Sequence, residues 1–236
     1  MFSEMVPAVV SVLMTLATPI DEDNGFRMAK PIAVQETLKN PPRIDLDPYP
    51  LVMQVCRKGY GSNIPKADRL KRIVGFARQV EVTDKVTLYT SPVKEGCLIS
   101  GFGYRRLIKE EHHRLHKGLD IAHPAPTPVY TAGAGVVLEA EYHHAYGNYL
   151  LIDHGDNVYT RYAHLDELQA AIHVGQFVVE GQTIGVMGTS ADKPVGRHLH
   201  FEILTGNYDT RWGSYGLKPR DILRLPAHGH LEMSLF

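Results

Sequence analysis

The segment VGRHLHFEI, residues 195–203, carries an alternation that decides its local structure. Leucine, phenylalanine and isoleucine take every second position, and two histidines and a glutamate stand between them. A period of two is typical of a β-strand with one buried face and one polar face. His198 and His200 are therefore expected to emerge side by side from the same face. Two adjacent imidazoles are either structural or part of a site, and this strand alone leaves both interpretations open.

From about residue 84 onward, short apolar runs alternate with residues that favour turns. Runs such as KVTLYTSP, TPVYTAGAGVVLEAEY and QFVVEGQTIGVMG are separated by glycine, proline, asparagine and aspartate. Strands of this length with these breaks predict an all-β domain. The segment NYLLIDHGDNVYTRYAHL, residues 148–165, predicts a hairpin with HGDN as its turn.

The bulk composition fits one domain with a small appendage. The chain has 236 residues, of which 44% are apolar. Its net charge of −1, with mixed signs, argues against nucleic-acid binding through a broad basic surface. The two cysteines, Cys56 and Cys97, lack the CxxC spacing of a cysteine zinc site. They form either one disulfide, in an oxidising compartment, or two buried free thiols, and we favour the thiols.

The N-terminal part differs in character from the rest. Residues 5–20, MVPAVVSVLMTLATPI, carry no charge, so residues 1–20 are predicted to be a signal peptide or short anchor. A buried strand or helix is the alternative for this run. Residues 21–90 are predicted to be a linker or cap, with a short amphipathic helix over 65–80 that begins at Pro65. Residues 226–236 are predicted to be a C-terminal tail.

A histidine and an aspartate four residues apart stand in LHKGLDIAHP, residues 115–124. The prolines that follow make a long helix unfavourable. On an extended segment His116, Gly118 and Asp120 share one face, with Gly118 leaving open space between the other two. His116, Asp120 and one histidine from the strand predicted over residues 195–203 would form a His₂Asp set. Three such ligands plus a position for water are typical of a catalytic zinc site. Alone, such a pair is more often a surface ion pair.

Together, in their order along the chain, the motifs are specific enough to indicate a protein family. Along the chain stand SGFGYRR, HKGLDIAHPAPTPVYTAGAGVV, YGNYLLIDHG, YTRYAHLDEL, VGQFVVEGQTIGVMGTS and GRHLHFEI. This succession resembles the M23 family of zinc metallopeptidases, the lysostaphin-like or LytM-type peptidoglycan endopeptidases. The resemblance implies a mainly β fold. It consists of a compact antiparallel β-sheet metallopeptidase domain over residues 91–225 and a small N-terminal extension that contains the short helix.

The resemblance also implies roles for five side chains. His116, Asp120 and His200 fall on the metal ligands of the family, for one Zn²⁺ per chain. His164 and His198 fall on its two catalytic histidines, which do not bind the metal. The sequence contains no H-E-x-x-H motif that would supply a glutamate base. The two free histidines are therefore expected to assist a metal-activated water.

The implied activity is zinc-dependent hydrolysis of peptide bonds in bacterial peptidoglycan, in the stem peptide or the cross-bridge. The implied location is the cell envelope, periplasmic or secreted, with membrane contact only through residues 1–20. The alternative is a non-catalytic LytM-type module that binds the envelope or activates an amidase. Family members that only activate other enzymes often lack some of the five residues. Because all five are present here, we favour the peptidase.

Overall fold

The computed structural model describes residues 52–56, 67–68, 73–75, 77–106, 113–192, 196–209 and 211–228. The chain divides into two units, Met1–Pro41 and Pro42–Phe236, and every described residue belongs to the second. The predicted signal peptide or anchor in residues 1–20 and the tail beyond residue 228 lie outside these ranges. Within the ranges, no helix is long and apolar enough to cross a membrane.

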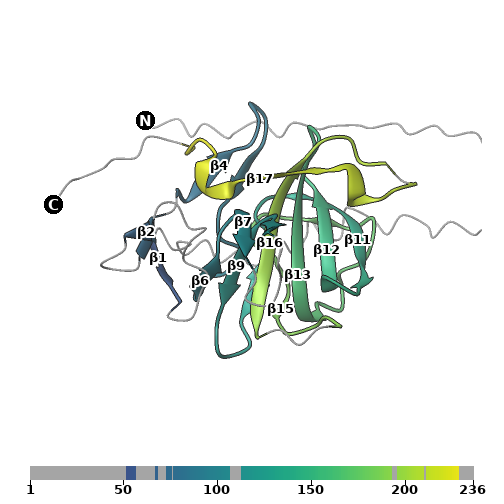
Figure 1. The fold of residues 1–236 in the computed structure, drawn as a ribbon. Helices are drawn as coiled ribbons and strands as arrows, with labels where there is room; N and C mark the ends of the chain where they lie inside the picture. The colour runs from purple at the N-terminus through teal and green to yellow at the C-terminus, as the bar shows by residue number, and fades with distance from the viewer. Residues whose placement is uncertain are drawn as a thin grey trace, which may run out of the picture. The chain divides into compact units, whose positions relative to one another are not determined.

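Six antiparallel strands form the centre of the sheet (Figure 1). Their spatial order is β11 (Gly135–His143), β12 (Gly147–Asp153), β13 (Val158–Leu168), β16 (His198–Thr205), β9 (Leu119–Ala122) and β6 (Cys97–Ser100). The predicted hairpin is confirmed, because β12 and β13 pair antiparallel around residues 154–157. In its turn Gly155, Asp156 and Asn157 have positive φ angles, which these residue types tolerate best.

Shorter strands extend this centre. At its edges and corners lie β14 (Phe177–Val178) beside β11, β10 (Pro128–Tyr130) beside β15 (Thr183–Met187), and β17 (Lys218–Arg220) beside β16. Strand β15 also pairs with β13. The helical elements of the described residues are two 3₁₀ turns, η2 (Ser214–Gly216) and η3 (Ile222–Arg224). The predicted mainly β, antiparallel fold is therefore confirmed.

Residues before position 91 also contribute strands. β1 (Val52–Val55) pairs in parallel with β6 and antiparallel with β3 (Ile73–Gly75), which pairs with β2 (Ala67–Asp68). β4 (Gln79–Glu81) and β5 (Thr87–Tyr89) form a separate antiparallel pair. Through β1, β2 and β3, the extension predicted before the peptidase domain thus continues the same sheet.

The helix predicted over residues 65–80 is wrong for the described part of that range. These residues form β2, β3 and the start of β4. Short apolar runs fit a helix and a strand about equally well, so tertiary pairing decides between them. Here Val74 and Val80 are buried in the core as strand residues. Their β-branched side chains fit a pleated surface better than a helix.

A disulfide joins Cys56, just after β1, to Cys97 at the start of β6, with the Cα atoms 5.0 Å apart. The two strands pair in parallel beside it, Gln54 with Cys97 and Val55 with Leu98. Our preference for free thiols is therefore wrong. The sequence could not decide between the alternatives, because the bond depends on which N-terminal strand lies beside β6.

Strand β16 is buried on both faces. On its apolar face Leu199, Phe201 and Ile203 are fully buried, and Phe201 packs against Tyr162 of β13 with ring centroids 5.3 Å apart. Burial of each such side chain contributes roughly 1.5–3 kcal/mol. The opposite, polar face is buried as well. Its two histidines and its glutamate contact other polar side chains of the site described below.

Replacing both cysteines, as Cys56→Ala with Cys97→Ala, is expected to lower the free energy of unfolding by about 2–4 kcal/mol. The bond closes a loop with a sequence separation of 41 residues, and its loss restores the freedom of that loop in the unfolded chain. Urea unfolding followed by circular dichroism measures the difference. Equal stability of the variant and the oxidised parent would contradict the prediction.

Candidate active site

The three predicted ligands meet where β8 (His113–His116), β9 and β16 come together. Strand β8 pairs with β7 (Gly103–Arg106) and ends at His116. The chain then bends and enters β9, where Asp120 is the cross-strand partner of His200 on β16. All three side chains are buried, and one ligand atom from each lies within 4.8 Å of the others. The structure thus brings together the His₂Asp set named from the sequence.

Gly118 does not have the role predicted for it. A Cβ at this position would lie 2.0 Å from the carbonyl oxygen of Phe201, so glycine is required for the bend to approach β16. His116 and Asp120 do not share the face of one strand, because they lie on β8 and β9. They converge because the chain turns between these strands.

Outer hydrogen bonds determine which ring nitrogen of each histidine is free. His116 Nδ1 lies 2.6 Å from the Gly101 carbonyl oxygen, and His200 Nε2 lies 2.8 Å from Glu202 Oε1. These oxygens accept hydrogen bonds, so both nitrogens donate an N–H. The opposite nitrogens, His116 Nε2 and His200 Nδ1, face Asp120 Oδ1 at 2.9 and 2.7 Å.

These three inward atoms need a cation among them. His116 Nε2 and His200 Nδ1 are 3.1 Å apart, and without a proton or a metal ion among them these nitrogens and the carboxylate would repel one another. Burial lowers the pKa of His200, but its hydrogen bonds to Asp120 and Glu202 outweigh burial and raise it to about 9. Burial raises the pKa of Asp120, but hydrogen bonds from both histidines hold it well below its usual range. A proton satisfies the set, and its N₂O donors equally fit a divalent metal such as zinc.

His198 and His164 lie beside this set. Their ring centroids are 4.5 Å apart, and His198 Nε2 is 4.0 Å from Asp120 Oδ1. His198 Nδ1 donates to the Gly196 carbonyl at 2.7 Å, and His164 Nδ1 donates to the Ser190 carbonyl at 3.0 Å. In the neutral ring, Nε2 is then the nitrogen that can accept a proton.

Burial keeps both of these histidines neutral. It lowers the pKa of His164 to about 4, and the neighbouring His198 adds to the effect. It also lowers the pKa of His198, against the opposing charge of Asp120. A neutral imidazole near pH 7 can take up a proton during a reaction. Both imidazoles are therefore uncharged near pH 7, and the Nε2 atom of each can accept a hydrogen bond.

His164 reaches this position through a break in β13. Its φ of 63° lies in the left-handed region, where residues other than glycine are uncommon. In a regular strand His164 would share a face with Tyr162, which is in the core. The break instead brings the His164 ring against His198. The backbone N–H of His164 donates to the Tyr146 carbonyl at 2.7 Å. Backbone strain of this kind is frequent at functional sites.

Glu202 is a site residue that the sequence analysis missed. It is fully buried, and it accepts hydrogen bonds from His200 and, at 2.7 Å, from Arg161. Burial raises the pKa of Glu202, but His200, Arg161 and Lys117 together lower it to about 2. The signal was available, because Glu202 continues the alternation that presents both histidines of β16 on one face.

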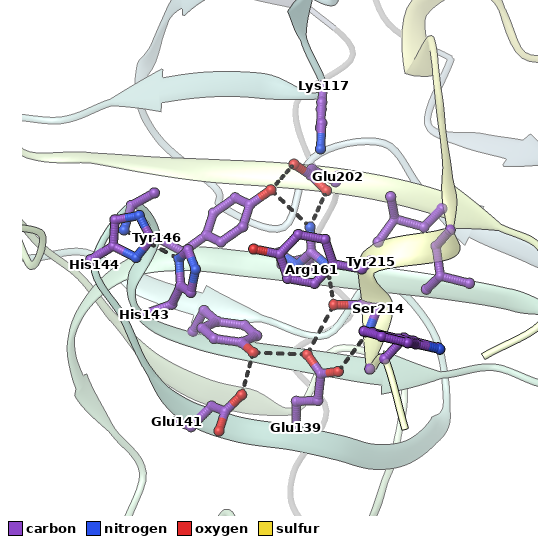
Figure 2. A pocket seen from close by; sticks show the side chains of 16 residues that line it. Lys117, Glu139, Glu141, His143, His144, Tyr146, Arg161, Glu202, Ser214 and Tyr215 are labelled. Atoms are coloured by element: carbon purple, nitrogen blue, oxygen red, sulfur yellow. Dashed lines mark hydrogen bonds and ion pairs between the residues drawn. The ribbon is translucent and has the colours of Figure 1, made fainter. Parts of the chain in front are cut away.

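A cavity of about 450 Å³ opens beside the site (Figure 2). Tyr146, Arg161 and Glu202 line it on the side of His200, and Figure 2 shows them joined by hydrogen bonds. The remaining walls include carboxylates of β11, a tyrosine of β12 and exposed aromatic residues around η2: Glu139, Glu141, Tyr149, Trp212 and Tyr215.

Comparison with known proteins agrees with this geometry. Residues 114–211 match the model of Peptidase family M23, and all five predicted site residues fall within that range. The resemblance to this family that the order of the motifs predicted is thereby confirmed for this part of the chain.

The relatives of this chain include enzymes of Vibrio cholerae. It is 44% identical to the peptidoglycan DD-endopeptidase ShyA over 89 residues, which are 38% of this chain and 20% of that protein. It is 36% identical to the peptidoglycan DD-endopeptidase ShyC over 121 residues, 51% of this chain and 27% of that protein. A crystal structure of a zinc-containing peptidase from Vibrio cholerae matches with 34% identity and a TM-score of 0.50, over 59% of this chain and 40% of that one. The matched part is thus less than half of each relative.

Two histidines of β16 provide a matched test of the ligand set. His200→Ala is expected to abolish binding of one equivalent of zinc, because it removes one of three donor atoms. His198→Ala, two residues away on the same face, is expected to retain the metal. Metal content after dialysis, measured by plasma mass spectrometry, separates the two. Loss of zinc from both variants alike would contradict the assignment.

Proposed function

We propose that this chain is a zinc-dependent endopeptidase that hydrolyses peptide bonds of bacterial peptidoglycan, in the stem peptide or the cross-bridge. The observation that carries the proposal is the convergence of His116, Asp120 and His200 beside two neutral histidines. The match of residues 114–211 to the M23 family and relatives named peptidoglycan DD-endopeptidases support it.

In this proposal His116, Asp120 and His200 hold one zinc ion per chain. Bound zinc supplies a Lewis acid that polarises a peptide carbonyl and lowers the pKa of water. His198 and His164 take a proton from the attacking water and deliver one to the leaving amine. Their unprotonated Nε2 atoms support this role, because each Nδ1 already donates to a backbone carbonyl.

The cavity beside Tyr146 and Glu202 is proposed to take the peptide on one side of the scissile bond. Its walls combine tyrosine rings, carboxylates and Arg161, which offer hydrogen bonds and apolar contact to a polar peptide. Its position next to His200 supports this, since the Tyr146 ring centroid lies 6.0 Å from that of His200.

A location in the cell envelope follows from the proposed substrate. The disulfide between Cys56 and Cys97 supports it, because such bonds persist in oxidising compartments. A signal peptide or anchor in residues 1–20 stays a prediction. The rival function, a non-catalytic module that binds the envelope or activates an amidase, differs in one measurable respect, because it binds without hydrolysis.

His164→Ala and His198→Ala are each expected to lower the rate of hydrolysis by roughly 10²–10⁴-fold while zinc stays bound, because each removes an acid–base group. The assay incubates the full chain with peptidoglycan and counts new amino groups. Addition of a chelator should abolish their release, and added zinc should restore it. His173→Ala, at an exposed position, is the matched control and should remain fully active.

Release of amino groups that is unaffected by both substitutions would refute the catalytic assignment. Absence of release from a folded, zinc-loaded chain would favour the binding module.

A further inference from the structure

Arg161 is a buried arginine linked by one carboxylate to a predicted metal ligand. It lies on β13 directly across from Glu202 on β16 and is 4% exposed. Its Nη1 donates to Glu202 Oε2 at 2.7 Å, and Glu202 Oε1 accepts from His200 Nε2 at 2.8 Å. Glu202 thus connects the guanidinium to the imidazole.

The same guanidinium reaches two parts of the cavity wall (Figure 2). Nη1 also donates to the Tyr146 hydroxyl at 3.0 Å, and Nη2 donates to Ser214 Oγ in η2. The Tyr146 hydroxyl donates in turn to Glu202 Oε1 at 3.3 Å. Arg161, Tyr146 and Glu202 therefore form a closed set of hydrogen bonds, which restricts the carboxylate to one orientation.

Stability does not account for this arrangement. A buried ion pair is often no more stabilising than apolar residues of similar volume. Arg161 Nε is also the one buried side-chain nitrogen or oxygen of the described residues that lacks a hydrogen-bond partner, which costs free energy. What the arrangement does achieve is a fixed, ionised carboxylate behind His200. Carboxylates in that position fix the tautomer and the ring orientation of metal-binding histidines.

We propose that Arg161 is a positioning residue of the metal centre. It orients Glu202, and through Glu202 it holds His200 with the N–H on Nε2 and with Nδ1 directed toward Asp120. The proposal rests on the metal site of the proposed function and is independent of peptide hydrolysis.

The test measures zinc affinity of the full chain by competition with a chelator of known affinity. Arg161→Met removes the guanidinium, Arg161→Lys keeps the charge without the planar fork, and Glu202→Gln removes the carboxylate charge. Leu151→Ala is the matched control, because Leu151 is fully buried and is the cross-strand partner of Arg161 on β12. Cobalt absorption spectra report the ligand geometry, and thermal unfolding reports the fold.

Arg161→Met and Glu202→Gln are each expected to weaken zinc binding by roughly 10–100-fold and to change the cobalt spectrum. Arg161→Lys is expected to lose less. The double variant, Arg161→Met with Glu202→Gln, should bind zinc about as weakly as either single variant, because both substitutions act on the same contact with His200. Leu151→Ala should unfold at a lower temperature yet keep the affinity and spectrum of the parent.

Parental zinc affinity and an unchanged cobalt spectrum in Arg161→Met would overturn the proposal, and so would an equal loss of affinity in Leu151→Ala. If Arg161→Met does not fold, Arg161→Lys decides by the same two readouts. A parent chain that binds zinc but cleaves no peptidoglycan would refute the endopeptidase and leave this inference standing. A parent that binds no zinc would overturn both.

Discussion

Two imidazole nitrogens and one carboxylate oxygen are held within 3.1 Å of one another in a buried position, and the surrounding structure maintains this unfavourable approach. The β9–β16 register sets Asp120 beside His200, and the glycine bend at Gly118 brings His116 against them. A slip of one residue would exchange the two faces of β16 and move His200 into the apolar core. The core side of that strand, with Leu199 and Phe201, therefore determines the geometry of the polar side.

Strand β13 contributes side chains both to the apolar core and to the site. The irregular backbone at His164 allows it to do both. Tyr162 before the break and Leu165 after it are both fully buried, so the irregularity does not interrupt the core. A left-handed residue of this kind costs about 1–3 kcal/mol, an amount that burial of these neighbours offsets. Opposite His200, the strand carries the small Ala163, which leaves room for the ring. A regular strand would place His164 on the wrong face for the site.

The sequence predicted those parts that depend on local pattern or on the order of motifs. The alternation around His198 and His200 identified a strand, and HGDN identified a hairpin turn. The predictions that failed concern features that depend on partners distant in the chain. The strands within residues 65–80 exist because β3 pairs with β1, and the disulfide exists because β1 pairs with β6. Glu202 belonged to a visible pattern, but its importance depends on Arg161 across the sheet.

The balance of buried charge explains how the same site can exist with either a proton or a metal. Asp120 and Glu202 are both ionised, and one of these charges is met by the guanidinium of Arg161. Burial lowers the pKa of His200, but its hydrogen bonds to Asp120 and Glu202 raise it to about 9. A divalent ion at the three donors would displace that proton and take over its role, which would couple metal binding to proton release.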